Sequence, residues 1–176
     1  MFFFSSKRER NLWLLTLAVL VAIYSTLGPA RILANELRER NLLEITFAVV
    51  LFLIIAIITW HWVKKRPTWS DIGVAFGVAL VYLAAFLRME SPEERTHLIE
   101  YGIVAVLIYK ALQERVRQGY RVFSPAALTI IVTALLGLLD EVIQALLPSR
   151  VFDVRDTFLN ALAGFMAVAA MLAIAP

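Results

Sequence analysis

Acidic, basic and amide side chains gather between two strongly apolar segments, in the stretch Leu147 to Gly164, LPSRVFDVRDTFLNALAG. Asp153, Asp156 and Asn160 are spaced three and four residues apart, which places them on one face of a helix. Carboxylates gathered in this way can bind sugar hydroxyls or a divalent cation, or can act as a general acid and base. Arg150 adds a positive charge that suits a phosphate group.

Two other segments carry ionisable side chains inside apolar runs. His97, Glu100 and Tyr101 occupy positions i, i+3 and i+4 and so share a helical face. Glu141 and Gln144 occupy positions i and i+3 of a second helix. An ionisable group inside a membrane helix costs about 2.5–3.5 kcal/mol. We therefore expect the three segments to meet at one depth and to surround one polar site.

The composition places these groups in a membrane protein. Of the 176 residues, 61% are hydrophobic and 18% are charged, and the mean hydropathy is +0.78. Spans of about 20 apolar residues fill most of the chain. The absence of cysteine excludes disulfides, thiolate metal sites and cysteine nucleophiles. The net charge of +3 reflects topology and anionic lipid, and no nucleic-acid partner is expected.

Proline and capping residues divide the chain into segments. Pro29 disfavours continuation of the first span, Ser70-Asp71 offers a cap for the third, and Gly119 ends the fourth. The predicted fold is all-α, a polytopic membrane protein with about six transmembrane helices in one bundle and a single domain over residues 1–176. The expected spans are 11–30, 42–63, 70–87, 92–117, 125–147 and 154–175.

The distribution of Lys and Arg predicts the orientation. With the N-terminus inside, the inner segments hold more basic residues than the outer ones, and most acids lie outside. Both termini are therefore predicted to be cytoplasmic, in a multi-pass membrane protein. In this orientation the polar residues of the three segments all lie in the outer half of the bilayer.

Each polar residue also has a purely structural interpretation. Asp153 can be the N-cap of the last helix, with Asp156 favoured by the helix dipole, and the sequence leaves open which role they have. Asp140 adjoins Glu141 on a different side of the helix, and reaching the outer water would explain it. Gly73 and Gly77 form a G-x-x-x-G spacing, to which we assign a packing role.

The segment from Glu141 to Gly164 resembles the signature of the VanZ-like membrane proteins. It reads Glu141-x-x-Gln144, then Leu-Pro and Arg150, then Phe-Asp153-Val-x-Asp156, and ends at Asn160 and Gly164. The segment from His97 to Gly102, HLIEYG, is similar to a second signature of that family, and Tyr24-Ser25 also fits. Ser149, where Gly is more usual, and Asp140 depart from the pattern. The resemblance implies a bacterial cell-envelope protein linked to low-level teicoplanin resistance, without a defined reaction.

Three functions remain open at this point. In the first, an outer-leaflet pocket binds the head of a membrane lipid, a lipid-linked cell-wall precursor or a polyprenyl phosphate. In the second, the protein is an enzyme acting on such substrates, with a divalent cation such as Mg²⁺, Mn²⁺ or Ca²⁺ or with acid–base catalysis. The third is transport, which the clustering at one depth disfavours. The catalytic candidates are Glu141, Asp156 and His97; the binding candidates are Arg150, Asp153, Gln144, Asn160, Glu100 and Tyr101.

Overall fold

The computed structural model describes residues 4–42, 45–46, 49, 68–88, 92–146 and 154–173. Within these ranges the chain is helical and contains no strand, as predicted. The predicted span 42–63 lies almost entirely outside the described residues, so the count of six spans stays a prediction. The described helices are α1 (Lys7–Glu39), α3 (Trp69–Arg88), α4 (Pro92–Arg117), α5 (Pro125–Ala145) and α6 (Val154–Ala173).

The connection between α4 and α5 follows from two local signals. Gly119 adopts a left-handed conformation with φ of 86°, and its N–H donates to the carbonyl of Val116 at 2.9 Å. Only glycine adopts this conformation at little cost, so α4 ends here as predicted. Ser124 then caps α5, because its Oγ accepts from the N–H of Ala127 at 3.2 Å and Pro125 begins the helix.

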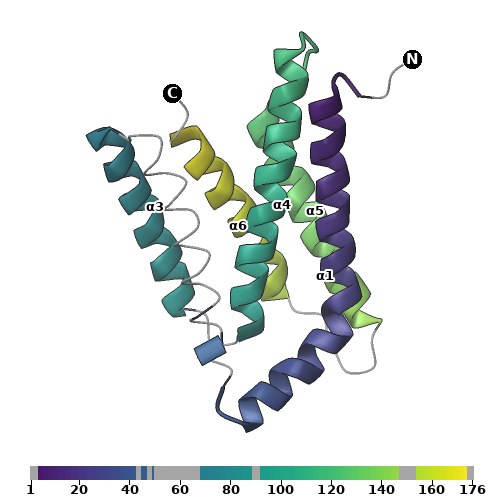
Figure 1. Ribbon diagram of the computed structural model, residues 1–176, viewed down its shortest axis with the longest axis vertical. Helices are drawn as coiled ribbons and strands as arrows, with labels where there is room; N and C mark the ends of the chain where they lie inside the picture. The colour runs from purple at the N-terminus through teal and green to yellow at the C-terminus, as the bar shows by residue number, and fades with distance from the viewer. Residues whose placement is uncertain are drawn as a thin grey trace.

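The first helix differs from the prediction. We expected it to end near Pro29, yet α1 continues as a helix to Glu39. Figure 1 shows that it changes direction in its C-terminal part instead of ending. A proline removes one backbone donor and crowds the preceding turn, which bends a helix that packing keeps intact. The charged segment after Pro29, which includes Glu36, Arg38 and Glu39, is therefore part of α1.

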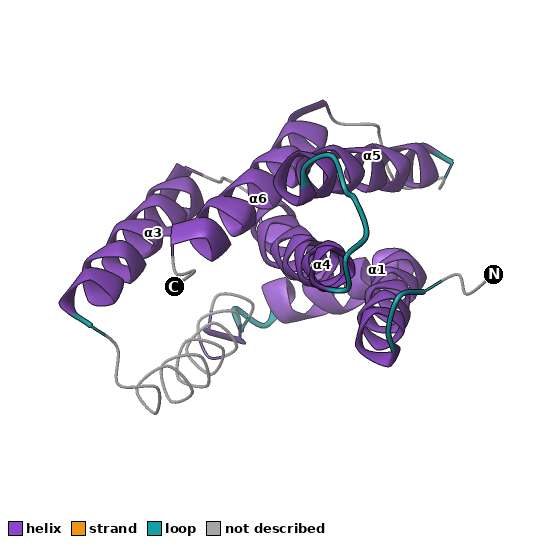
Figure 2. Ribbon diagram, turned by 90° about the horizontal axis from the view of Figure 1, so that it is seen from above, coloured by secondary structure: helices purple, strands orange, loops and turns teal. Residues whose placement is uncertain are grey.

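Helix α4 occupies the centre of the bundle. It packs against α1, α5 and α6, and α3 contacts α6. Figure 2, seen from above, shows α4 between α1 on one side and the α5–α6 pair on the other. Val104 and Ile108 of α4 form a core cluster with Ile23 of α1, and Leu98 and Tyr101 form a second one with residues of α6. The helix with the most interrupted apolar sequence is thus the one most enclosed by its neighbours.

The helices alternate in direction. In Figure 1, α1 begins at the same end of the molecule at which α4 and α6 end, while α4 and α6 begin at the opposite end with the C-terminus of α5. This arrangement brings the start of α4, the end of α5 and the start of α6 to one end of the bundle. The three polar segments identified in the sequence therefore meet at one end.

A separate polar cluster ties α1 to α4 at the other end. We call it the N-terminal cluster: Ser5, Ser6, Glu9, Glu114 and Arg115. Ser6 caps α1 by accepting from the N–H of Glu9 at 3.0 Å, and its Oγ lies 3.1 Å from Oε1 of Glu114. Arg115 forms an ion pair with Glu9 at 3.1 Å. Ser6 and Glu9 have the Ser-x-x-Glu spacing of a capping box, a signal that we did not use to predict where the first helix begins.

Candidate functional site

The fully buried residues of α5 are polar or small. Its buried residues are Thr129, Thr133, Gly137, Asp140, Glu141 and Gln144. Its exposed large side chains are apolar: Ile131, Leu135, Leu138, Leu139 and Val142. A soluble protein shows the opposite distribution, because burial of apolar surface stabilises its fold. Polar groups turned inward and apolar groups turned outward are typical of a helix whose surroundings are lipid.

Two glycines bring α5 and α6 into close contact. A Cβ atom on Gly137 would clash with the side chain of Asn160, and a Cβ on Gly164 would lie 3.0 Å from Cβ of Thr133. These two contacts are one helical turn apart on each helix and define an antiparallel register. One turn further toward the polar end, the same register places Asp156 opposite Glu141. Asp156 is 9% exposed there.

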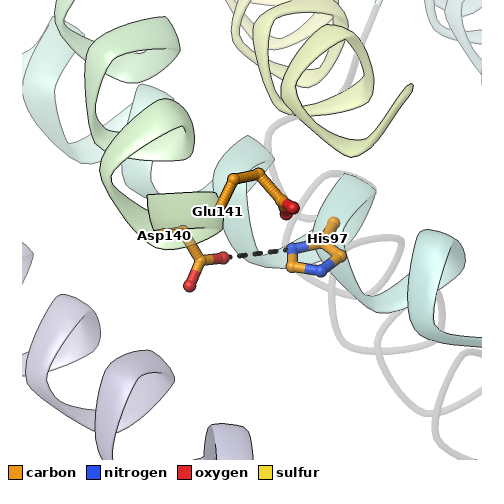
Figure 3. Close-up of side chains that lie close together, drawn as sticks. All are labelled: His97, Asp140 and Glu141. Atoms are coloured by element: carbon orange, nitrogen blue, oxygen red, sulfur yellow. Dashed lines mark ion pairs between the residues drawn. The ribbon is translucent and has the colours of Figure 1, made fainter. Parts of the chain in front are cut away.

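The centre of the candidate site consists of His97, Asp140 and Glu141, which we call the polar cluster. Figure 3 shows that the two carboxylates, from adjacent positions of α5, are both directed toward the imidazole ring of α4. Nδ1 of His97 lies 3.4 Å from Oδ2 of Asp140. All three side chains are buried, and one ligand atom from each lies within 4.8 Å of the others. This spacing allows the three groups to share one ion.

Further side chains surround the polar cluster. Nε2 of Gln144 is 3.4 Å from Oε1 of Glu141, and the ring of Tyr101 stacks on His97 with centroids 6.1 Å apart. One turn before Asp140 on α5, the carbonyl of Leu136 accepts hydrogen bonds from the hydroxyls of Tyr24 and Tyr101, at 3.1 and 3.2 Å. Helix α1 thereby reaches the same layer, so four helices enclose this end of the site.

The predicted site residues fall into three groups. The structure brings His97, Glu141 and Gln144 together, with Asp156 and Asn160 on the facing stripe of α6. Glu100 is half-buried on α4, and the Tyr101 hydroxyl contacts the Leu136 backbone. Arg150 and Asp153 lie outside the described residues, so their predicted roles stay predictions.

The sequence left open whether Asp140 reaches the outer water or belongs to the site. Its side chain is 0% exposed and pairs with His97, so it is part of the polar cluster. Adjacent residues of a helix point about 100° apart, and a neighbouring helix that lies between the two directions contacts both. Here α4 lies in that position, so Asp140 and Glu141 approach one histidine. The sequence did contain a signal for this burial, because Asp140 is an acidic residue inside a strongly apolar run.

Comparison with known families identifies the family of the chain. The sequence model of VanZ/LLP1 matches residues 1–175. The chain belongs to the VanZ/LLP1 family. Among curated proteins no match to this VanZ/LLP1 chain was found, and none was found among solved structures.

The family and the composition of the helices together indicate a membrane protein. Within the described part of this VanZ/LLP1 chain, Pro125–Ala145 and Val154–Leu172 are long and apolar enough to cross a bilayer. These two helices also carry most of the buried polar groups. Apart from His97 of α4, the candidate site is therefore built on these two apolar helices, on side chains that face away from the surrounding apolar surface.

Proposed function

We propose that this VanZ/LLP1 chain is a multi-pass protein of the bacterial inner membrane that binds the phosphate-bearing head of an envelope lipid. The binding pocket would lie in the outer half of the bilayer, between the start of α4, the end of α5 and the start of α6. A lipid-linked cell-wall precursor or a polyprenyl phosphate has the required chemistry. We also propose that this chain shares the link of the family to teicoplanin resistance.

The observation that supports the proposal is the burial of the polar cluster in an otherwise apolar protein. Removing a carboxylate from water costs several kcal/mol unless charge and hydrogen bonds compensate for it. His97, Asp140 and Glu141 are all at most 4% exposed. Fold stability alone would be better served by apolar residues of the same size, so a polar ligand is the better explanation.

The polar residues have distinct roles in this proposal. Arg150 would pair with the phosphate through its guanidinium, whose paired donors match two oxygen atoms. Asp156, Asn160 and Gln144 would orient the head group by accepting from or donating to its hydroxyls. The lipid chains would follow the exposed apolar faces of α5 and α6.

Native mass spectrometry of the purified protein tests lipid binding. We expect the wild-type chain to retain a polyprenyl phosphate, and Arg150→Ala and Asp156→Asn to lose it. Arg155→Ala is the matched control, because Arg155 is an exposed base next to Asp156. Equal retention by all four proteins, or equal retention of an uncharged polyprenol, would show that the pocket does not recognise the head group.

One contact favours a second candidate function, hydrolysis or transfer at the same head group. A carboxylate next to an imidazole holds the ring for proton transfer, and Asp140 lies 3.4 Å from Nδ1 of His97. In this case His97, Glu141 and Asp156 would act on the bound lipid. Release of inorganic phosphate from a polyprenyl diphosphate, absent in His97→Ala, would distinguish an enzyme from a binding protein.

A further inference from the structure

The geometry of the polar cluster matches that of a metal site. In a tetrahedral site with metal–ligand bonds of about 2.0–2.1 Å, neighbouring ligand atoms are roughly 3.3 Å apart. Nδ1 of His97 and Oδ2 of Asp140 are 3.4 Å apart. For bonds of about 2.1–2.4 Å, ligands on opposite sides of an ion are separated by roughly 4.2–4.8 Å. The ligand atoms of the polar cluster all lie within 4.8 Å of one another.

The charges of the polar cluster also favour a cation. A protonated imidazole carries one positive charge, whereas two carboxylates adjoin His97. The register of α5 and α6 brings a third carboxylate, that of Asp156, to the level of Glu141. A divalent cation bound by His97, Asp140 and Glu141 offsets the negative charge at short range, where the low dielectric of the interior makes the attraction strong.

An amide beside the polar cluster provides an independent observation. Asn160 is 0% exposed, and among the described residues neither its Nδ2 nor its Oδ1 has a hydrogen-bond partner. Its side chain lies against Gly137, one helical turn from Glu141. A buried amide without partners costs about 1–3 kcal/mol. Its oxygen is an acceptor suited to a water bound to a cation, and such a water would remove the part of that cost that belongs to the oxygen.

We propose that His97, Asp140 and Glu141 bind one divalent first-row cation, Zn²⁺ or Mn²⁺. One imidazole and two carboxylates suit these ions better than Mg²⁺ or Ca²⁺, which prefer oxygen ligands alone. Three protein ligands leave a coordination position open, as in metal sites that bind a substrate. The open position would bind a phosphate oxygen of the lipid head, and this role rests on the proposed function. The binding of the cation itself does not.

Metal titration of the full chain in detergent tests the site. The protein is stripped with a chelator, and Zn²⁺ or Mn²⁺ is then added without lipid. We expect one ion per chain, and we expect binding to be lost in His97→Gln and in Glu141→Gln. The loss should exceed the about 10–100-fold effect that removal of an outer hydrogen-bond partner has on metal affinity. Asp140→Asn should behave as the other two variants do.

Glu114→Gln is the matched control, because Glu114 is a buried acid of the N-terminal cluster at the other end of α4. It should bind the metal as the wild type does. Monodisperse elution of each variant confirms that it is folded. A wild-type chain that binds neither ion, or that binds it unchanged in His97→Gln and Glu141→Gln, would overturn the cation site.

The two proposals can fail separately. Arg150→Ala should lose the polyprenyl phosphate and keep the cation, because Arg150 is not one of the three proposed metal ligands. If the metal-free wild type still binds the lipid and no metal binds, the proposed function stands and the cation site is wrong. If the cation binds and no lipid is retained, the cation site stands and the lipid-binding function is wrong.

Discussion

Glu9 is a buried carboxylate surrounded by donors. The Ser5 N–H and Oγ both donate to its Oε2 at 2.6 Å, and Nε1 of Trp13 donates to its Oε1 at 3.3 Å. Arg115 of α4 adds an ion pair at 3.1 Å. Burial by itself raises the pKa of Glu9, yet the hydrogen bonds and the nearby guanidinium together lower it below the ordinary value. Glu9 therefore links the start of α1 to the end of α4 in its ionised form.

The lowered pKa of Glu9 predicts a loss of stability in acid. A group whose pKa is lower in the folded state stabilises the fold above its unfolded pKa, here 4.5. This contribution is lost as the pH falls through the folded pKa. We expect Glu9→Gln to lower the free energy of unfolding by about 1.5–3 kcal/mol at neutral pH, as is typical of hydrogen bonds to charged groups. Thermal unfolding in detergent between neutral pH and pH 3 measures the difference.

The difference between wild type and Glu9→Gln should be constant at neutral pH and should shrink below pH 4.5. Glu39→Gln serves as the control, because Glu39 is exposed at the other end of α1. It should unfold as the wild type does at every pH. A difference for Glu9→Gln that does not change with pH would mean that the carboxylate acts through packing and not through its charge.

At the scale of the elements, the pair α5–α6 depends on close approach of two backbones. Gly137 faces the side chain of Asn160, and Gly164 faces Thr133. In lipid, helices associate through packing and hydrogen bonds, since the surroundings are as apolar as their side chains. Small residues at the contact are therefore needed to place Asp156 and Asn160 against the polar face of α5.

Substitution of these glycines should separate the two helices. We expect Gly137→Ala to destabilise the protein by about 1–3 kcal/mol, as overpacking usually does. The effect of Gly164→Ala should be smaller, because an added Cβ meets Thr133 at 3.0 Å and a smaller shift relieves it. Thermal unfolding in detergent measures both effects. Because the shift moves α6, binding of the lipid head should weaken as well.

Gly77 offers a matched comparison on α3. Among the described residues, none places a heavy atom within 4 Å of a Cβ built on Gly77. Gly77→Ala should therefore be neutral, or stabilising by up to about 1 kcal/mol through helix propensity. Destabilisation by Gly77→Ala equal to that by Gly137→Ala would show that helix propensity or lipid exposure, and not the α5–α6 contact, determines the effect.

Local signals and periodicity could be interpreted correctly from the sequence. The Ser124-Pro125 cap, the end of α4 at Gly119 and the inward faces that carry His97 and Glu141 follow from residue types and spacing. The role of Pro29 could not be predicted, because packing decides whether a proline ends or bends a helix. The burial of Asp140 could not be predicted either, because it depends on where α4 lies relative to α5.

At the scale of the whole molecule, the N-terminal cluster and the polar cluster lie at opposite ends. The N-terminal cluster lies where α1 begins and α4 ends, and the polar cluster lies where α4 begins and α5 ends (Figure 1). If α4 crosses the bilayer, the two clusters face opposite sides of the membrane. The excess of Lys and Arg near the N-terminal cluster predicts that this end is cytoplasmic. On that prediction the polar cluster would lie toward the outside.

Single cysteines test this orientation. The natural chain has no cysteine, so a membrane-impermeant maleimide can label only the introduced one. Glu39, at the C-terminus of α1, and Gln118, just after α4, are both exposed. We expect Glu39→Cys to be labelled in intact spheroplasts, and Gln118→Cys to be labelled only after the membrane is permeabilised. The unsubstituted chain is the control and should remain unlabelled.

Each of the other labelling patterns contradicts a different part of this orientation. Reversed labelling would place the polar cluster on the cytoplasmic side, where it could not meet a lipid head in the outer leaflet, although a cation could still bind there. Labelling of both cysteines in intact spheroplasts would mean that α1 does not separate the two ends of the bundle across a bilayer. Because α4 is the most polar and most enclosed of the described helices, the side on which Gln118→Cys is labelled tests whether α4 crosses the membrane.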